Sequence, residues 1–180
     1  MNPLPEVLPL ADLVLKKPGV EHAPFVHAWA SDPLVTKYLS FRPHKSLDET
    51  IGVIRRWARA WAESEGVILP GRTLTYLIFL EDEPVGSLGV HGERYGLELS
   101  YALARAHWGK GIVPKAVRGV TEWLLDHGAH RVYATAHVEN TASHRVLEKA
   151  GFVREGRLAK YFFFPNLGAY ADGYLYARVE

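Results

Sequence analysis

Apolar side chains recur at helical spacing in several stretches of this chain. Each stretch is apolar on one face and polar on the other, which is typical of a helix packed on a core. We predict helices over residues 23–30, from Leu47 to Trp61, from Val113 to Leu124, and over residues 140–151. Ser46, with Glu49 three residues later, predicts a capping box at the start of the second helix.

Runs rich in β-branched and aromatic residues lie between these helices and are typical of strands. We predict strands over residues 11–17, 96–104, 131–138, 152–158 and 170–179, and a hairpin over residues 72–90 that turns at Glu81–Pro84. The aromatic stretch 161–170 is predicted to be the loop between the last two strands. Its three adjacent phenylalanines cannot all face one core, because successive strand side chains point to opposite faces. The proline-rich residues 1–10 are predicted to form an irregular arm.

The order of these elements is strand, helices, three strands, helix, strand, helix and two strands. Such an order predicts an α/β or α+β layer with a mixed sheet. A helix connects the strands at 96–104 and 131–138, so we expect this pair to be parallel with a right-handed connection.

Composition narrows the class of protein more than it narrows the function. The 180 residues suit one domain, and 48% hydrophobic with 23% charged residues is ordinary for a soluble globular protein. A formal net charge of +1 gives no support for a nucleic-acid-binding face. The absence of cysteine excludes disulfides, thiolate metal sites and cysteine nucleophiles. With no apolar run of membrane-spanning length and no signal-peptide pattern, we expect a cytoplasmic protein without membrane contact.

Two glycines, Gly109 and Gly111, stand between a predicted strand and a predicted helix. The first turn of a helix presents unpaired backbone N–H groups and the positive end of the helix dipole, so it can bind an anion. Glycine allows positive φ and close approach of an anion, Pro114 is compatible with a first helical turn, and Lys110 adds a positive charge. Neither the dinucleotide-binding nor the P-loop glycine pattern is present. A plain glycine turn is therefore an equal alternative to an anion site.

The stretch NTASHRVLEKAGF, residues 140–152, carries start and stop signals of its own. Asn140 is a good N-cap, and Gly151 suits the C-terminal end of the helix. Ser143 lies in the first turn with its hydroxyl near the helix mouth. A capping role explains Asn140 in any case, and it does not exclude contact with a ligand.

The sequence HWGKGIVPKAV, followed about thirty residues later by NTASHRVLEKAGF, resembles the GNAT superfamily of acyl-CoA-dependent N-acetyltransferases. Within it, the chain is similar to the RimJ/RimL-type branch, which acetylates the N-terminal amine of ribosomal proteins. The stretches LVLKK, DPLVTKYLSFRP, LELSYAL, REGRL and ADGYLYAR follow the order of the family. The resemblance implies one acyl-CoA N-acyltransferase domain over residues 1–180. Its central sheet would be mixed but mostly antiparallel, flanked by helices, and would contain one splayed parallel strand pair.

The resemblance also implies acetyl-CoA as the co-substrate, without a metal. The pyrophosphate would lie on the backbone N–H groups of Trp108, Gly109, Lys110, Gly111, Ile112 and Val113. Backbone groups of Tyr101 and Leu103 would hold the pantetheine arm between the splayed strands, with a hydrogen bond from Asn140. Ser143 would lie near the sulfur and protonate the departing thiolate.

The cofactor loop departs from the family pattern at four positions. Trp108 stands where the superfamily often has Arg or Gln, and Val113 replaces a small residue. Pro114 is unusual in this branch, and Lys115 stands where the branch usually has Glu. These differences bear on the shape and the charge of the loop.

Direct acyl transfer to an amine requires a group that takes up a proton. Glu98 is the first candidate, because strand alternation places it on one face with Ser100 and Ala102. A solvated strand carboxylate is an equal alternative. His137, at the end of the facing strand, is the second candidate, although a lone histidine is more often structural. A backbone N–H of the 96–104 strand is the candidate for stabilising the oxyanion.

Three further polar residues have structural interpretations. Asp172 is predicted either to hold a loop or to receive a substrate ammonium. His127 and His130 are interpreted as surface residues rather than metal ligands, because no carboxylate stands at ligand spacing.

Three functions fit this sequence. The first is an N-acetyltransferase that acts on a protein N-terminus, such as that of a ribosomal protein. The second acts on a small amine such as a polyamine, an aminoglycoside or an amino-acid derivative, and the third is a non-catalytic acyl-CoA-binding module. The candidate acceptor loops, with residues 41–46 facing residues 161–166, carry no acidic cluster, which disfavours a polycationic acceptor. In this family the aromatic region borders the acceptor site or a homodimer contact.

Overall fold

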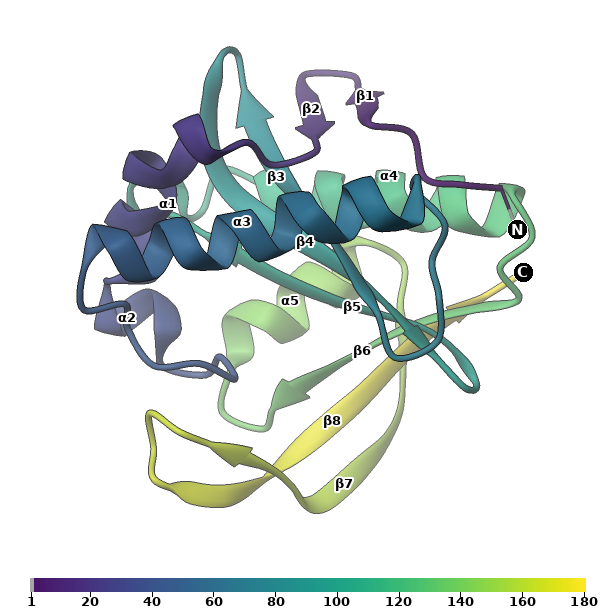
Figure 1. Ribbon diagram of the computed structural model, residues 1–180. Helices are drawn as coiled ribbons and strands as arrows, with labels where there is room; N and C mark the ends of the chain where they lie inside the picture. The colour runs from purple at the N-terminus through teal and green to yellow at the C-terminus, as the bar shows by residue number, and fades with distance from the viewer. Residues whose placement is uncertain (1) are drawn as a thin grey trace.

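One sheet runs through the whole molecule, with its strands in the order β1-β2-β3-β4-β5-β6-β8-β7 (Figure 1). The computed structural model describes residues 2–180. The strands are β1 (Val7–Leu10), β2 (Leu13–Lys16), β3 (Thr73–Leu80), β4 (Glu83–Glu93), β5 (Gly96–Leu103), β6 (Arg131–His137), β7 (Val153–Phe164) and β8 (Ala169–Val179). All neighbouring strands are antiparallel except β5 and β6, which are parallel. The predicted mixed sheet is confirmed.

Helices cover both faces of this sheet (Figure 1). They are α1 (Ala23–Ala30), α2 (Pro33–Thr36), α3 (Leu47–Ser64), α4 (Ile112–Asp126) and α5 (Thr141–Lys149), with short 3₁₀ turns at Val20–His22 and Arg105–His107. The larger core lies under α4 and α5, and a smaller one lies between α1, α3 and strand β3. In the part of the chain described here, no helix has the length and apolar composition needed to cross a membrane.

Strand β5 shows how alternation assigns side chains to the two faces. Leu97, Leu99 and Leu103 are buried in the core under α4 and α5. Glu98 and Ser100 therefore point to the opposite face, as predicted, because successive residues of a strand alternate. We call this opposite side, which also carries α1 to α3, the acceptor face.

The parallel pair separates soon after it begins. Hydrogen-bonded pairing joins only Leu97 to Val132 and Glu98 to Tyr133. Beyond these residues β5 continues along β4, and β6 continues along β8. The sheet therefore opens at its centre, which confirms the predicted splay.

The predicted irregular arm at residues 1–10 is wrong for its second half. Val7–Leu10 forms strand β1, which pairs with β2 from Val7–Lys16 to Leu10–Leu13. Burial of Leu4 and Leu8 in the core holds this segment against the sheet. Its prolines are tolerated because β1 is an edge strand, where an unpaired position costs little.

The predicted loop at residues 161–170 is also too long. Tyr161–Phe164 belongs to β7, and only residues 165–168 form the turn before β8. The prediction that the phenylalanines face different environments is confirmed, since Phe164 is buried and Phe163 is 48% exposed. A register shift between Leu158 and Phe162, with Lys160 at a φ of 43°, lets the strand bend there.

The predicted capping box at the start of α3 is formed only in part. Ser46 is the N-cap, and its Oγ accepts a hydrogen bond from the Glu49 N–H at 3.2 Å. The Glu49 carboxylate accepts from the N–H of Lys45 at 2.8 Å, one residue before the position that a capping box requires.

Candidate functional site

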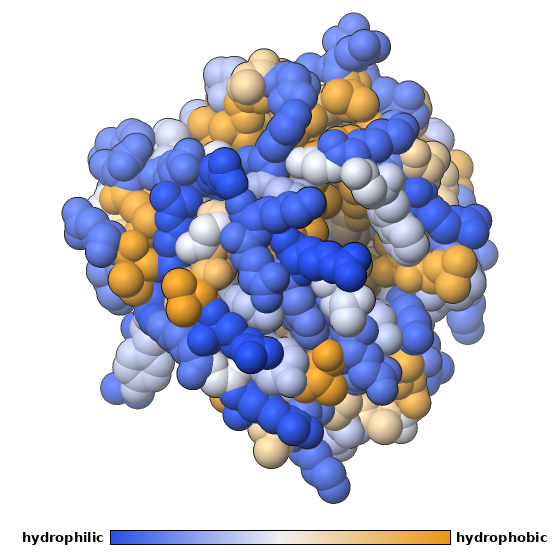
Figure 2. Space-filling view, turned by 180° about the vertical axis from the view of Figure 1, so that it is seen from behind, coloured by the Kyte–Doolittle hydropathy of each residue, from blue (hydrophilic) through white to orange (hydrophobic). Residues whose placement is uncertain are grey.

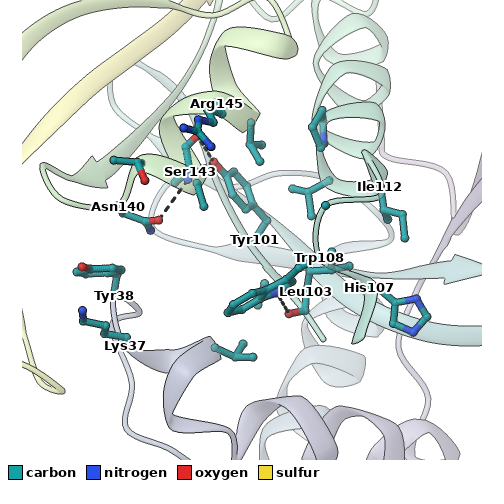
Figure 3. Close-up of a pocket in the computed structure, with 18 of the residues that line it drawn as sticks. Lys37, Tyr38, Tyr101, Leu103, His107, Trp108, Ile112, Asn140, Ser143 and Arg145 are labelled. Atoms are coloured by element: carbon teal, nitrogen blue, oxygen red, sulfur yellow. Dashed lines mark hydrogen bonds between the residues drawn. The ribbon is translucent and has the colours of Figure 1, made fainter. Parts of the chain in front are cut away.

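A cavity of about 650 Å³ lies where β5 and β6 separate (Figure 3). On one side it is lined by residues 107–109 and 111–114, before and at the start of α4, and by residues of the stretch 139–149, which includes α5. On the other side it is lined by residues 34–39, which include the end of α2. Since these segments belong to opposite faces of the sheet, the cavity passes through the opening from one face to the other.

The loop before α4 has the conformation that its glycines permit. Gly109 has a φ of 77° and Gly111, the N-cap of α4, has a φ of 75°. A Cβ added at either glycine would meet nothing within 4 Å. Positive φ, rather than crowding, is therefore the reason for glycine at both positions.

Backbone N–H groups of this loop are free to bind a ligand. Within residues 2–180, no protein acceptor takes the N–H groups of residues 109–113. The prediction that the Trp108 N–H also binds the pyrophosphate is wrong, because that N–H donates to the Arg105 carbonyl at 3.1 Å. No side chain caps the α4 N-terminus, and Pro114 occupies its first turn without an N–H. The loop thus has the donors and the dipole that the sequence predicts for an anion site.

Positive side chains line the cavity, two of them on α5 and one on the wall formed by residues 34–39. Lys37, Arg145 and Lys149 line it, against a single lining carboxylate, Glu139, among the described residues. Within residues 2–180, none of the three cations has an ion-pair partner. Figure 2 shows hydrophilic side chains spread over the middle of the face that carries α4 and α5. This surplus of positive charge suits a polyanionic ligand.

Lys115, the unusual residue of the loop, is neutralised elsewhere. Its Nζ donates to the Asp12 carboxylate at 2.5 Å, and both side chains are about half exposed. Its charge is therefore tied to the β1–β2 turn and is balanced there.

The exposed backbone edge of β5 faces the cavity. The Ala104 N–H bonds Val85 of β4, so Ala104 points toward β4. Because backbone groups alternate in direction along a strand, those of Tyr101 and Leu103 point into the opening. The Leu103 carbonyl already accepts a hydrogen bond at 2.9 Å from the indole Nε1 of Trp108, which lies beside it in Figure 3.

Ser143 meets two other residues of the site (Figure 3). Its N–H donates to Asn140 Oδ1 at 3.2 Å, which confirms the predicted cap. Its Oγ lies 2.7 Å from the hydroxyl of Tyr101, whose pKa is raised by burial. Tyr101 therefore stays protonated over the range in which an enzyme works. With Asn140 Oδ1 engaged, the amide N–H₂ of Asn140 is left for a ligand.

Glu98 lies apart from the cavity lining. It sits at the closed end of the parallel pair, and its carboxylate accepts a hydrogen bond from Thr135 Oγ1 at 2.9 Å. Burial raises its pKa, which the bond from Thr135 offsets in part. The structure places Glu98 on the acceptor face with Ser100 and Ala102, and only Ala102 of the three lines the cavity.

His137 is packed as a structural residue. Its ring stacks on Tyr38 at 4.7 Å and meets the edge of Phe164 at 4.7 Å. Its Nδ1 accepts the Glu139 N–H at 3.1 Å, so the neutral ring carries its proton on Nε2. Burial lowers the pKa of His137. The ring has no free lone pair, which argues against its use as the base.

Asp172 holds a loop, one of its two predicted roles. One carboxylate oxygen accepts the Lys160 N–H at 2.8 Å, and the other accepts from Arg157 Nε at 2.7 Å. These contacts fix the bend of β7. His127 stacks on Trp123 at 4.0 Å, at the far end of α4 from the cavity.

Three features of the site escaped the sequence analysis. They are the Tyr101 side chain, the Trp108 indole and residues 34–39 as the wall on the acceptor face. The first and the third depend on contacts between distant segments, whereas the indole bonds a carbonyl only five residues away. Only the motif around residues 32–43 gave a signal. Residues 41–46 do meet the β7–β8 turn, where Asn166 Nδ2 donates to the Phe41 carbonyl at 2.7 Å.

A mixed sheet that opens at one parallel pair, with a free helix N-terminus beside the opening, defines an acyltransferase of the predicted class. Residues 12–153 match the family described as "Acetyltransferase (GNAT) domain". The chain belongs to this family, and it is an N-acetyltransferase of the GNAT type.

Relatives and solved structures agree with this assignment. The Bacillus licheniformis protein "Uncharacterized N-acetyltransferase p20" is 30% identical over 166 residues, 87% of each chain. RimJ of Mycobacterium smegmatis, solved with CoA-disulfide, superposes with a TM-score of 0.78 at 25% identity, over 96% of this chain and 86% of that one. The Salmonella typhimurium acetyltransferase described as modifying the N-terminal serine of ribosomal protein L7/L12 has a TM-score of 0.82 at 22% identity, over 97% and 99% of the two chains.

Proposed function

We propose that this protein transfers the acetyl group of acetyl-CoA to the N-terminal amine of a protein or peptide. The observation that carries the proposal is the cavity that passes through the sheet between β5 and β6. Acetyl-CoA enters from the α4 and α5 side, the amine enters from the acceptor face, and the two meet at the opening. The whole chain acts as one acyltransferase domain, and we expect it in the cytoplasm.

Backbone groups make most of the proposed contacts with acetyl-CoA. The free N–H groups of residues 109–113 hold the pyrophosphate, helped by Lys110 and by the positive end of the α4 dipole. Backbone groups of Tyr101 and Leu103 pair with the pantetheine arm as a neighbouring strand would. The Asn140 amide donates to the same arm.

The chain's side chains handle the protons of the reaction. Acetyl-CoA supplies an acetyl thioester, whose carbon–sulfur bond breaks as the amine forms its bond to carbon. Ser143 protonates the departing thiolate. In the orientation in which the Tyr101 hydroxyl donates to Ser143 Oγ, the hydrogen of Ser143 is free to point at the sulfur. Glu98 draws the acceptor ammonium to this face and is a candidate base through a bridging water.

The wall of the acceptor side favours a peptide over a polyamine. Residues 34–39 contribute Leu34, Val35, Tyr38 and Leu39, with Lys37 as their charged member. A polycation would meet a positive charge here instead of a carboxylate cluster, whereas a peptide brings one ammonium and an apolar side chain. The Salmonella enzyme with the same fold, which modifies an N-terminal serine, supports this choice.

Two other functions remain as alternatives. The same enzyme acting on a small amine would keep every feature of the donor side and differ in the acceptor. A non-catalytic acyl-CoA-binding module would keep the loop at Gly109 and Gly111 without using Ser143.

The test is CoA release from acetyl-CoA with a panel of acceptors. The panel contains peptides that begin with Ala, Ser and Met, together with spermidine, an aminoglycoside and free amino acids. We expect turnover with a peptide, and we expect Ser143→Ala to lower kcat by roughly 10²-fold, the usual effect of a general acid. Turnover with only a small amine would replace the proposed acceptor. Tight acetyl-CoA binding without any turnover would support the binding module.

The glycine loop has a separate test in the affinity for acetyl-CoA. Gly111→Ala forces an L-residue to a φ of 75°, at a cost of about 1 kcal/mol. We expect weaker acetyl-CoA binding by calorimetry together with a lower Tm. Gly156→Ala is the matched control, since that glycine has no positive φ and open space around it. Unchanged affinity in Gly111→Ala would mean that the loop is only a turn.

A further inference from the structure

A chain of hydrogen bonds crosses three strands on the acceptor face, outside the cavity lining. Thr73 Oγ1 on β3 lies 2.7 Å from His91 Nδ1 on β4. His91 Nε2 in turn lies 2.7 Å from Ser100 Oγ on β5. Ser100 is exposed, and His91 is half-buried. A hydroxyl is activated for proton transfer when it bonds an imidazole that a third group holds in orientation. Ser100, His91 and Thr73 are these three groups.

Gly89 leaves the space in which this contact forms. It is the cross-strand partner of Ser100 and has no positive φ, so its backbone does not require glycine. A Cβ at this position would lie 2.7 Å from Ser100 Oγ and 3.3 Å from His91 Nε2. The absence of a side chain at Gly89 therefore permits the bond between His91 and Ser100.

Ser100 stands between this chain of hydrogen bonds and the reacting groups. It precedes by two residues Ala102, which lines the cavity and points to the same face. Two strand residues span roughly 7 Å, a distance that two waters in series can bridge. Ser100 also lies just past Glu98, where the pairing of β5 with β6 ends, so it borders the opening itself.

We propose that His91, acting through Ser100, takes the proton that the acceptor amine releases during acetyl transfer. This inference rests on the proposed function. His91 waits as the tautomer with its proton on Nδ1, which donates to Thr73, and its Nε2 accepts the Ser100 hydroxyl. Ser100 passes its hydrogen to His91 Nε2 as its oxygen receives one from the amine, directly or through water.

The protons of the reaction balance with this assignment. An ammonium acceptor and acetyl-CoA give an amide, CoA thiol and one free proton. The nitrogen loses two protons, of which one ends on the thiol through Ser143. The other goes through Ser100 to His91 and from the imidazolium to water.

The surroundings of His91 keep its ring neutral and able to accept a proton. Burial lowers its pKa, which outweighs the opposite effect of Glu93 on the same strand. The other charged residues beside it are Glu98, its cross-strand partner on β5, and Arg72, which precedes β3. At neutral pH the ring is therefore uncharged, with a lone pair for the incoming proton.

Steady-state kinetics with the acceptor found in the panel test the inference. The variants are His91→Gln, which removes the base, and Ser100→Ala, a mild change at an exposed site. His130→Gln, an exposed histidine at the far end of α4, is the matched control. We expect kcat to fall by roughly 10²-fold in His91→Gln and to fall in Ser100→Ala, with the KM for acetyl-CoA within about twofold of wild type. The part of the acid limb that follows the titration of His91 should disappear in His91→Gln, leaving only the rise in rate with pH that follows the free amine.

The outcomes separate this inference from the proposed function. If the wild type turns over and His91→Gln has an unchanged kcat and pH profile, this inference is overturned and the proposed function stands. Glu98 is then the remaining candidate base, and Glu98→Gln tests it. No wild-type turnover with any amine overturns the proposed function and this inference with it. Nitrogen-15 NMR of the histidine rings gives a readout that needs no acceptor. His91 should be the Nδ1–H tautomer, and an Nε2–H tautomer would contradict the relay.

Discussion

Glu98 and Asp172 are two carboxylates that the sequence placed near the acceptor, and their surroundings act on them in opposite directions. The Lys160 N–H and the Arg157 guanidinium hold the pKa of Asp172 below its usual value. Burial raises the pKa of Glu98, and the bond from Thr135 offsets this only in part. Asp172 is therefore an anion that stabilises the bend of β7. The charged form of Glu98, in contrast, is destabilised by its burial.

This difference predicts how stability depends on pH. Because the pKa of Glu98 is higher in the folded protein, the folded state binds the proton more tightly than the unfolded chain. Its stabilising contribution is complete at pH values below the unfolded value of 4.5 and is lost as the pH rises through the folded pKa. We expect Glu98→Gln to raise Tm at pH 7 by a few degrees at most, and to have no such effect at low pH.

Thermal unfolding followed by circular dichroism at several pH values checks this expectation. Glu155→Gln is the control of opposite sign, since Arg131 lowers the pKa of Glu155. That substitution should lower Tm at pH 7. A lower Tm for Glu98→Gln at pH 7 would mean that the bond to Thr135 outweighs the cost of burial.

At the scale of elements, two helices present their N-termini to one cavity in different ways. Asn140 caps α5 through its side chain, so the Ser143 N–H is already bound. The α4 N-terminus has glycine at its N-cap and no side-chain cap. Donors that no side chain uses can bind an anion, which is why we propose that the pyrophosphate binds at α4 and not at α5.

Two substitutions separate the two roles of Asn140. Asn140→Ala removes the cap and should cost about 1 kcal/mol of stability, along with affinity for acetyl-CoA. Asn140→Asp keeps an oxygen for the Ser143 N–H but has no amide hydrogen to donate, so stability should be kept and affinity lost. Denaturant unfolding and calorimetric titration measure the two effects. Equal affinity in Asn140→Asp and wild type would restrict this residue to capping.

At the scale of the whole molecule, the acceptor side is built from segments far apart in the sequence. Asn166, in the turn between β7 and β8, donates to the carbonyls of Thr36 and Phe41 at 2.6 Å and 2.7 Å. Phe164 meets the edge of His137, which stacks on Tyr38. The β7–β8 hairpin and residues 36–41 thus form one wall, held together by the Asn166 amide and by these aromatic contacts.

Substitution of Asn166 should weaken binding of the acceptor and leave binding of acetyl-CoA unchanged. We expect Asn166→Ala to raise the acceptor KM several-fold while the Kd for acetyl-CoA stays near wild type. Asn166→Asp should act more strongly, because a carboxylate would face two carbonyl oxygens without a hydrogen to donate. Steady-state kinetics with the acceptor, alongside acetyl-CoA titration, measure both. A matched loss of acetyl-CoA affinity would contradict a wall confined to the acceptor side.

Local signals were enough to predict most elements and the backbone geometry of the donor side. The glycine loop, the Asn140 cap and the parallel strand pair were all predicted, because each depends on neighbouring residues or on one helical connection. Strand β1 and the extent of β7 were missed. An edge strand rich in proline and a run of aromatic residues look irregular in sequence, and only their partners β2 and β8 make them strands.

The sequence by itself determined which residues stand on each face of a strand or helix, since side chains follow the fixed periods of the backbone. Only the tertiary structure decided which of these residues meet. Tyr101 reaches Ser143 across the cavity, and the bonds of Thr73, His91 and Ser100 depend on the register of three strands. Register is set by long-range pairing and by the core beneath it, and a shift of one residue would turn each of these side chains to the other face.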